Sequence, residues 1–396
     1  MSSPAEIAAP APRRDARRIA LTIAGFAIAF RLFSAFLALL VNVVFPDYAP
    51  APFTVWGTAS PFWDAFARYD SGQYWQIARY GYTEGGMAYV AGGRSSIAFF
   101  PAYPLLMRYV GRAIGRSPAD LYIGGLIVSW VAFAIALIAI YQLARLDLSR
   151  RRALRAVLLT AIFPFAFFFG AVYTEALFLA ATAGAFYLFR TKRWLAGGLC
   201  GALATASRAN GILMWPALAW IVWREAGRDR ARAILGLLLV GAGIATYSLY
   251  IYRLTGNPFE WAATIERWGY YPGGSPISAL FGLGRAVLTH PYAFLAGERM
   301  APYDTLNAFA ALGALIAVPF VWRRFGADYG LFMAANLWLP LSSGQVEGMG
   351  RYVSVLFPLS IWLASLPSTT FTATTVVFGM LYTLCLALFT NIHPLF

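Results

Sequence analysis

The chain has 396 residues, of which 60% are hydrophobic and 12% charged, with a formal net charge of +14. Ordinary globular domains carry roughly 25% charged residues, so most of this chain cannot face water. The basic excess would suit nucleic acid binding only on a soluble domain with one basic face. Since the sequence offers no such domain, it predicts an integral membrane protein with arginines near the ends of its spans.

Apolar runs close to the length of about 20 residues that crosses a bilayer recur along the chain. They are 19–45, 121–143, 157–172, 176–189, 234–252, 305–321, 353–366 and 371–390. The first run is too long for a signal peptide and lacks a small-residue cleavage site, so it predicts a retained span. With a hairpin of two short spans at 194–223, these runs predict an all-α polytopic membrane protein with roughly nine to eleven transmembrane helices.

The organisation predicted is one integral membrane domain over 1–396. An alanine- and proline-rich stretch makes 1–18 a disordered cytoplasmic N-terminus. We find no internal repeat, which weakens a transporter interpretation without excluding it. Cys200 and Cys385 lie in apolar runs and predict neither a disulfide framework nor a metal site.

Basic residues cluster in alternate loops, and such clusters mark the cytoplasmic side. They are Arg13, Arg14, Arg17, Arg18, Arg145, Arg150, Arg151, Arg152, Arg155, Arg190, Lys192, Arg193, Arg224, Arg228, Arg230, Arg232, Arg323 and Arg324. If these clusters are cytoplasmic, the loops between them lie on the outer or lumenal face. Those loops are a first loop, 46–118, a second loop, 253–304, and the segment 342–351.

The segment 68–82, RYDSGQYWQIARYGY, gathers acid, base, amide and five aromatic side chains in the first outer loop. Asp70 followed by Ser-Gly-Gln resembles a capping box that starts a short surface helix, with Tyr74, Ile77 and Ala78 as its apolar stripe. A carboxylate there can cap the helix or serve as a general base, and the spacing leaves both roles open. The following segment 97–105, IAFFPAYPL, is apolar and stiffened by proline.

Asp64 gives this loop a second carboxylate. It can cap another surface helix, which we favour, or share a divalent cation or a catalytic role with Asp70. The chain has two histidines, His290 and His393, and neither is in this loop. A zinc site or a Ser-His-Asp triad therefore has almost no support.

Three charged residues interrupt apolar runs, where burial is costly and a partner or a wet cavity is expected. Arg31 lies in the first span, and bonding within the bundle is its expected role. Glu175 begins a span, and Arg208 lies beside Asn210 at the outer turn of the predicted hairpin. Proximity to Asp70 would make Arg31 or Arg208 a site residue.

The second outer loop is rich in aromatic and polar side chains. Trp261, Trp268 and Tyr270 could stack on a sugar or form an interfacial aromatic belt, and composition does not separate the two. Arginines on this face present a fork of donors that suits a phosphate. The candidates are Arg267, Arg285, Arg299 and Arg351.

Four segments resemble a known family in the order expected of it. RYDSGQYWQIARYGY with AFFPAYPL, FRLFSAFLALLVNVVFPDY at 30–48, FPFAFFFGAVYTEALF at 163–178 and ATASRANGIL at 204–213 are similar to blocks of the class V phosphatidylinositol-glycan mannosyltransferases and their bacterial relatives. The resemblance covers the first half well; beyond Trp223 the segments NPFEW and GRYVSVLFP are the most similar. It implies a glycosyltransferase C fold with a large first outer loop carrying surface helices.

The resemblance also implies an activity, the transfer of a sugar, mannose in the first instance, from a polyprenyl- or dolichyl-phosphate donor to a lipid or glycan hydroxyl on the outer face. Asp70 matches the acid of the family's first-loop motif. Eukaryotic relatives usually have Trp where this chain has Tyr69, and an acid and His where it has Gly72 and Gln73, so a lipid-anchor glycan precursor is not carried over as acceptor. We expect a multi-pass protein of a bacterial inner membrane.

The mechanism expected is a single displacement with inversion, in which Asp70 is the general base and an arginine, Arg351 first and Arg208 second, stabilises the leaving phosphate. The expected substrate-binding residues are Arg68, Gln73, Tyr74, Tyr82, Glu175, Arg208, Asn210, Arg267 and Arg351. No cofactor is required; a divalent cation is possible but not indicated. The competing interpretations are a transporter or flippase of a lipid-linked sugar and, last, a noncatalytic scaffold subunit.

Overall fold

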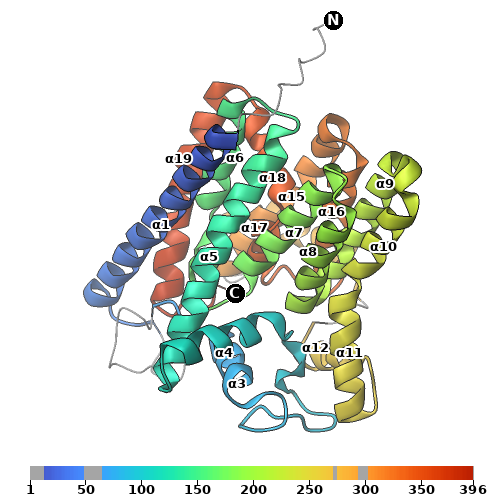
Figure 1. Ribbon diagram of the computed structural model, residues 1–396. Helices are drawn as coiled ribbons and strands as arrows, with labels where there is room; N and C mark the ends of the chain where they lie inside the picture. Colours follow the sequence, from blue (N-terminus) through green and yellow to red (C-terminus); the bar gives the residue numbers. More distant parts are fainter. Residues whose placement is uncertain (1–12, 49–64, 271–273, 293–301, 396) are drawn as a thin grey trace, which may run out of the picture.

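The computed structural model describes residues 13–48, 65–270, 274–292 and 302–395. Within these ranges the chain is built from helices, with no strand (Figure 1). The prediction of an all-α protein is therefore confirmed.

Four of the described helices are long and apolar enough to cross a membrane. They are α1 (Arg13–Val44), α5 (Pro118–Arg145), α15 (Pro302–Phe325) and α19 (Ser368–Thr390). The pair α10 (Arg230–Val240) and α11 (Ala242–Thr255), bent by 42°, makes a fifth crossing if it counts as one span. These helices confirm an integral membrane protein.

The other helices of the bundle are shorter and are packed among the long ones. They are α6 (Arg150–Ala161), α7 (Glu175–Arg190), α8 (Trp194–Ser207), α9 (Trp215–Glu225), α16 (Ala327–Leu341), α17 (Met349–Ser354) and α18 (Phe357–Ser365). The predicted hairpin at 194–223 is α8 and α9, joined by the 3₁₀ turn η5 (Ala209–Met214). Full-length helices thus account for fewer crossings than the nine to eleven expected. The predicted span at 157–172 is wrong, because α6 ends at Ala161, and α16 was not among the predicted spans.

One end of the bundle, here called the loop end, carries a layer of short helices: α3 (Ser71–Tyr80), α4 (Ala102–Ile114) and α12 (Glu260–Arg267), with the last turns of α11 among them (Figure 1). The remaining described elements are η3 (Ser96–Ala98), η4 (Ala166–Gly170), η6 (Gly227–Asp229) and α13 (Pro276–Thr289). The predicted surface helix is α3, which buries Tyr74, Ile77 and Ala78 as expected. Its first residue follows Asp70, so the loop end holds the candidate acid.

The helix α4 fixes this layer to the bundle by a close approach to α5. A Cβ atom added to Gly124 of α5 would lie 2.4 Å from the backbone nitrogen of Gly111 in α4. Small residues let two backbones come this near, and side chains then pack on both sides of the contact.

The chain between α6 and α7, residues 162–174, is buried throughout and contains no α-helix, only the 3₁₀ turn η4. Backbone of this kind is tolerated at membrane depth only where the protein satisfies its polar groups. Four side chains donate to its carbonyls: Arg31 to Ala166 (3.1 Å), Trp130 to Gly170 (3.1 Å), Ser129 to Ala171 (2.7 Å) and Ser71 to Val172 (3.1 Å). The stretch leads directly into Glu175.

Arg31 has the structural role that we expected. It is 2% exposed, donates to the Ala166 carbonyl, and its guanidinium carbon lies 4.2 Å from the centre of the Phe133 ring. A charge buried at this depth keeps to the protein interior. Arg31 therefore stabilises the broken stretch and is not a site residue.

Replacing Gly124 with alanine should lower the unfolding free energy by about 1–3 kcal/mol, the usual cost of overpacking, because α4 must move off α5. The matched control is Gly379→Ala in α19, where an added Cβ meets nothing within 4 Å. That control should be neutral or stabilise slightly through helix propensity. Both are measured by thermal and SDS-induced unfolding in micelles; equal losses would contradict the close α4–α5 contact.

Candidate active site

Asp70 stands immediately before α3 and faces outward from the packed core. Its side chain is 31% exposed, and within the described residues it makes no capping hydrogen bond to α3. Instead its Oδ2 accepts a hydrogen bond of 2.8 Å from Nη1 of Arg351. The predicted capping box is therefore wrong, since the carboxylate of Asp70 is turned away from the helix it precedes.

The backbone just before Asp70 is unusual. Tyr69 has φ +50°, in the left-handed region that aromatic residues seldom occupy. Such conformations cost of the order of 1–3 kcal/mol and persist where the surrounding structure imposes them, often at functional sites. Here the unusual backbone at Tyr69 directly precedes Asp70, whose carboxylate is bonded to Arg351.

Glu175 connects this pair to a second arginine. It is the first residue of α7, is completely buried, and its Oε1 accepts from Nε of Arg351 at 2.8 Å and from Nη1 of Arg208. Its Oε2 has no hydrogen-bond partner among the described residues. We call Asp70, Arg351, Glu175 and Arg208, in this order of contact, the charged row.

The charged row draws on four separate parts of the chain. Asp70 precedes α3, Arg351 lies in α17, Glu175 begins α7 and Arg208 directly follows α8. Acids and bases alternate, so the formal charges cancel, which is how a protein keeps ionised groups in an apolar surrounding. Since Asp70 and Arg351 are 281 positions apart, only the folded chain brings them together.

Aromatic rings hold both guanidinium groups. The guanidinium carbon of Arg351 lies 4.8 Å from the Tyr173 ring centre, and that of Arg208 lies 5.2 Å from the Tyr352 ring centre. Contacts of this type stabilise a cation most when water is excluded. The side chains remain 13% and 12% exposed, so each arginine also reaches the surface. Two fixed guanidinium forks side by side suit an anion with several oxygens, such as a phosphate.

Tyr270, which follows α12 in the second loop, lies beside the charged row. Burial, and then the neighbouring Tyr352 and Asp70, raise the pKa of Tyr270 well above its usual value, so its hydroxyl stays protonated. The loop itself is fastened to the first loop, because the Trp268 indole donates to the Ser95 carbonyl at 3.1 Å. Both predicted loops therefore meet at Asp70.

Three other predicted site residues have structural contacts. Arg68 is 1% exposed and donates to the Thr390 carbonyl at 3.0 Å, which ties the start of the site to the end of α19. Tyr82 donates to the Phe99 carbonyl at 2.7 Å. Tyr74 is buried, with its ring edge-on to Phe99. These residues support the position of Asp70 from behind.

The remaining candidates lie outside the charged row. Asn210 donates to the Asn336 side chain at 3.1 Å, and Arg267 is ion-paired with Glu260 at 2.7 Å. Gln73 is half-buried on α3, and Arg285 is exposed on α13. Asp64 and Arg299 fall outside the described residues.

Sequence reasoning missed two aromatic side chains, Tyr173 and Tyr352, that cover the arginines of the row. A signal was available, because Tyr352 directly follows Arg351 and Tyr173 lies two positions before Glu175. The described residues contain no group of three His, Cys, Asp or Glu side chains that could hold a metal ion.

Comparison with known proteins gives matches to sugar transferases. Residues 112–253 match the family model described as dolichyl-phosphate-mannose-protein mannosyltransferase. The GPI alpha-1,6-mannosyltransferase 2 of Cricetulus griseus is 27% identical over 205 residues, and that of Mus musculus is 28% identical. Each alignment covers 48% of this chain and 40% of the relative, so the chain spans less than half the length of these relatives.

Among solved structures, ArnT from Cupriavidus metallidurans, bound to undecaprenyl phosphate, is similar over 94% of this chain and 77% of its own, with a TM-score of 0.52 and 11% identity. At that identity the likeness shows the fold alone, which is the glycosyltransferase C fold. The family match at 112–253 includes Glu175 and Arg208 and leaves out Asp70 and Arg351.

Replacing Glu175 with glutamine should strongly destabilise the protein, by about 3–5 kcal/mol, because Arg208 and Arg351 keep their charges without a buried counterion. The matched control is Glu225→Gln, which breaks the more exposed pair with Arg224 and should change stability by less than about 0.5 kcal/mol. Unfolding of both variants is followed by SDS titration in mixed micelles. Similar small losses in both would show that Glu175 does not hold the arginines.

Proposed function

The chain has the glycosyltransferase C fold and is similar in sequence to mannosyltransferases; from this premise we propose that it transfers mannose from a polyprenyl-phosphate donor to a hydroxyl of a lipid or glycan. The observation that carries the proposal is the charged row. It sets a partly exposed carboxylate, Asp70, against Arg351, and the buried carboxylate of Glu175 holds both Arg351 and Arg208. This transfer requires a carboxylate that can accept a proton from the acceptor hydroxyl, and cations that stabilise the departing phosphate.

The proposed step is a single displacement that inverts the anomeric carbon. The acceptor oxygen forms a bond to that carbon as the bond from the carbon to the phosphate oxygen breaks, and Asp70 takes the proton of the acceptor hydroxyl. Negative charge gathers on the departing polyprenyl phosphate, where Arg351 and Arg208 stabilise it. The donor carries its own leaving group, the polyprenyl phosphate, so the step requires no nucleotide site.

The hydrogen bond between Arg351 and Asp70 gives this mechanism an order. While this bond persists, the Oδ2 atom of Asp70 is occupied by the guanidinium of Arg351. A donor phosphate competes for the same guanidinium, so its arrival releases Asp70 to accept a proton. The donor then binds before the acceptor is activated.

The proposed orientation follows the basic loops. The arginine-rich turns, including those after α5 and α7, lie at the end of the bundle opposite the loop end (Figure 1). By the positive-inside rule that end is cytoplasmic, so the charged row opens at the outer face of the membrane. We propose the bacterial inner membrane as its location.

An assay in detergent tests the function. The purified protein is incubated with polyprenyl-phosphate mannose and candidate lipid or glycan acceptors, and free polyprenyl phosphate and mannosylated product are measured. A transferase forms both without a sealed compartment. Absence of covalent product from every acceptor, with movement of the intact donor across vesicle membranes, would support a transporter or flippase instead.

Replacing Asp70 with asparagine should lower kcat about 10²- to 10⁴-fold, since general-base catalysis is lost, with expression and donor binding kept. The control is Glu84→Gln, an exposed carboxylate in the same loop. Transfer rates are compared at saturating donor, and donor binding is measured separately. Turnover by Asp70→Asn near that of Glu84→Gln would remove Asp70 from the role of base.

Replacing Arg208 with glutamine should weaken binding of polyprenyl phosphate by about ten- to a hundredfold, because one charge-assisted contact is worth about 1.5–3 kcal/mol. The control is Arg116→Gln, an exposed arginine between α4 and α5. Binding of polyprenyl phosphate is measured in nanodiscs, so the result does not depend on turnover. Equal affinities would place the phosphate away from Arg208.

A further inference from the structure

The hydroxyl of Tyr74 on α3 is a polar group that makes no hydrogen bond to the residues that the structure describes. Tyr74 is only 4% exposed, and its ring is fixed by three edge-on contacts. The ring centres of Tyr103, Phe99 and Tyr173 lie 5.3, 5.5 and 6.1 Å from that of Tyr74. A hydroxyl without a partner in such surroundings costs free energy, so we expect it to gain a partner when the site is at work.

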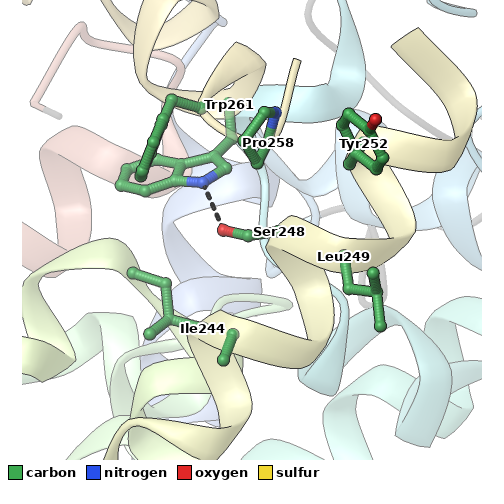
Figure 2. Close-up of a pocket in the computed structure, with 8 residues that line it drawn as sticks. Ile244, Ser248, Leu249, Tyr252, Pro258 and Trp261 are labelled. Carbon is green, nitrogen blue, oxygen red and sulfur yellow. Dashed lines mark hydrogen bonds between the residues drawn. The ribbon is translucent and has the colours of Figure 1, made fainter. Parts of the chain in front are cut away.

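The neighbouring tyrosines do not share this property. The hydroxyls of Tyr103 and Tyr173 donate to backbone carbonyls at 2.9 and 3.1 Å. Polar groups are also paired at the apolar pocket of about 580 Å³ between α11 and the segment that leads to α12, where the Trp261 indole donates to the Ser248 hydroxyl at 2.9 Å (Figure 2). That pocket therefore offers mainly carbon surface, whereas Tyr74 offers a donor that is not in use.

Tyr74 follows Asp70 by one helical turn. Its backbone N–H donates to the Asp70 carbonyl at 3.2 Å, so the two side chains are neighbours on the same face of α3. Long side chains in a helix lean toward its N-terminus, which here is the end that carries Asp70.

The hydroxyl of Tyr74 also lies in the electrostatic field of the whole charged row. Burial first, and then the negative charges of Asp70 and Glu175, raise the pKa of Tyr74, so that the hydroxyl keeps its proton. Among the charged groups, Asp70 acts on it most strongly. Tyr74 is therefore a neutral donor beside the carboxylate that we propose as the base.

We propose that Tyr74 is a positioning residue, whose hydroxyl donates to Asp70 once the donor phosphate has taken Arg351 from that carboxylate. The inference rests on the proposed function, since binding of the donor is what separates Asp70 from Arg351. In the structure Oδ2 of Asp70 is held by Arg351, and Oδ1 makes no hydrogen bond to the described residues. With one oxygen bonded to Tyr74, the other is free to take the proton of the acceptor hydroxyl. A neutral donor orients the carboxylate and leaves its negative charge in place.

A double-mutant cycle of Tyr74→Phe with Asp70→Asn tests this role, because it measures whether the hydroxyl acts through the carboxylate. Tyr74→Phe removes the hydroxyl and keeps the ring. With Asp70 in place it should lower kcat about tenfold, the low end of what a hydrogen bond to a charged group contributes. KM for polyprenyl-phosphate mannose and binding of polyprenyl phosphate should not change. In the Asp70→Asn protein, whose residual rate is measured with radiolabelled donor, the same replacement should change the rate by less than about twofold.

Tyr103→Phe is the matched control, because it removes a paired hydroxyl from a ring that touches Tyr74. It should lower the midpoint of SDS-induced unfolding and leave kcat unchanged. Tyr74→Phe should show the reverse, a lower kcat with an unchanged midpoint, which a role in packing alone would not produce.

The outcomes separate this inference from the proposed function. A Tyr74→Phe protein with the kcat of the wild type overturns the inference and leaves the function standing. An equal loss with and without Asp70, or a loss confined to donor affinity, also overturns it, because the hydroxyl would then act on the fold or on the donor. A wild-type protein that transfers no sugar to any acceptor overturns the proposed function and, with it, the role of Tyr74.

Discussion

The buried carboxylate of Glu175, shared by two arginines, is the interaction on which the candidate site depends. One oxygen of Glu175 accepts from both Arg351 and Arg208. Without it, two cations would stand close together in an apolar surrounding, and repulsion with desolvation would drive them apart or into water. With it, their remaining donors stay close to the outer carboxylate of Asp70. The positions of the partly exposed arginine side chains thus depend on the fully buried carboxylate of Glu175.

The fold makes this arrangement possible by interrupting a span. A continuous α-helix through 162–174 would satisfy its own backbone, but this stretch has only the 3₁₀ turn η4. Its carbonyls accept hydrogen bonds from the side chains of Arg31, Trp130, Ser129 and Ser71. The break lets α7 start inside the protein, so that its first residue, Glu175, lies fully buried. The donors that stabilise the break come from α1, α5 and α3, and the site is consequently tied to the whole bundle.

Much of this could be predicted from the sequence, because local patterns carry it. Apolar runs gave the helical membrane architecture, and the stripe of Tyr74, Ile77 and Ala78 gave α3. Costly charges in apolar runs singled out Glu175 and Arg208, which the structure pairs. The resemblance in four segments pointed to the fold that the comparison with ArnT bears out.

Other features could not be predicted, because they depend on which distant partner a side chain meets. The Asp-x-x-Gln spacing favoured a cap, but Arg351, 281 positions away, draws the carboxylate of Asp70 off the helix. Arg267 was predicted as a candidate phosphate ligand, and in the fold it is ion-paired with Glu260 of the same helix. A list of arginines on one face carries no information on pairing, and pairing decides which of them remain able to bind an anion.

The central claim is that a donor phosphate takes Arg351 from Asp70 and so creates the base. The most direct test is a cryo-EM structure of the protein in nanodiscs with a non-transferable polyprenyl-phosphate mannose analogue. We predict the phosphate bonded to Arg351 and Arg208, the bond between Arg351 and Glu175 kept, and the carboxylate of Asp70 freed toward the anomeric carbon. A phosphate bound elsewhere, or an Asp70 still bonded to Arg351 with the donor in place, would contradict the account.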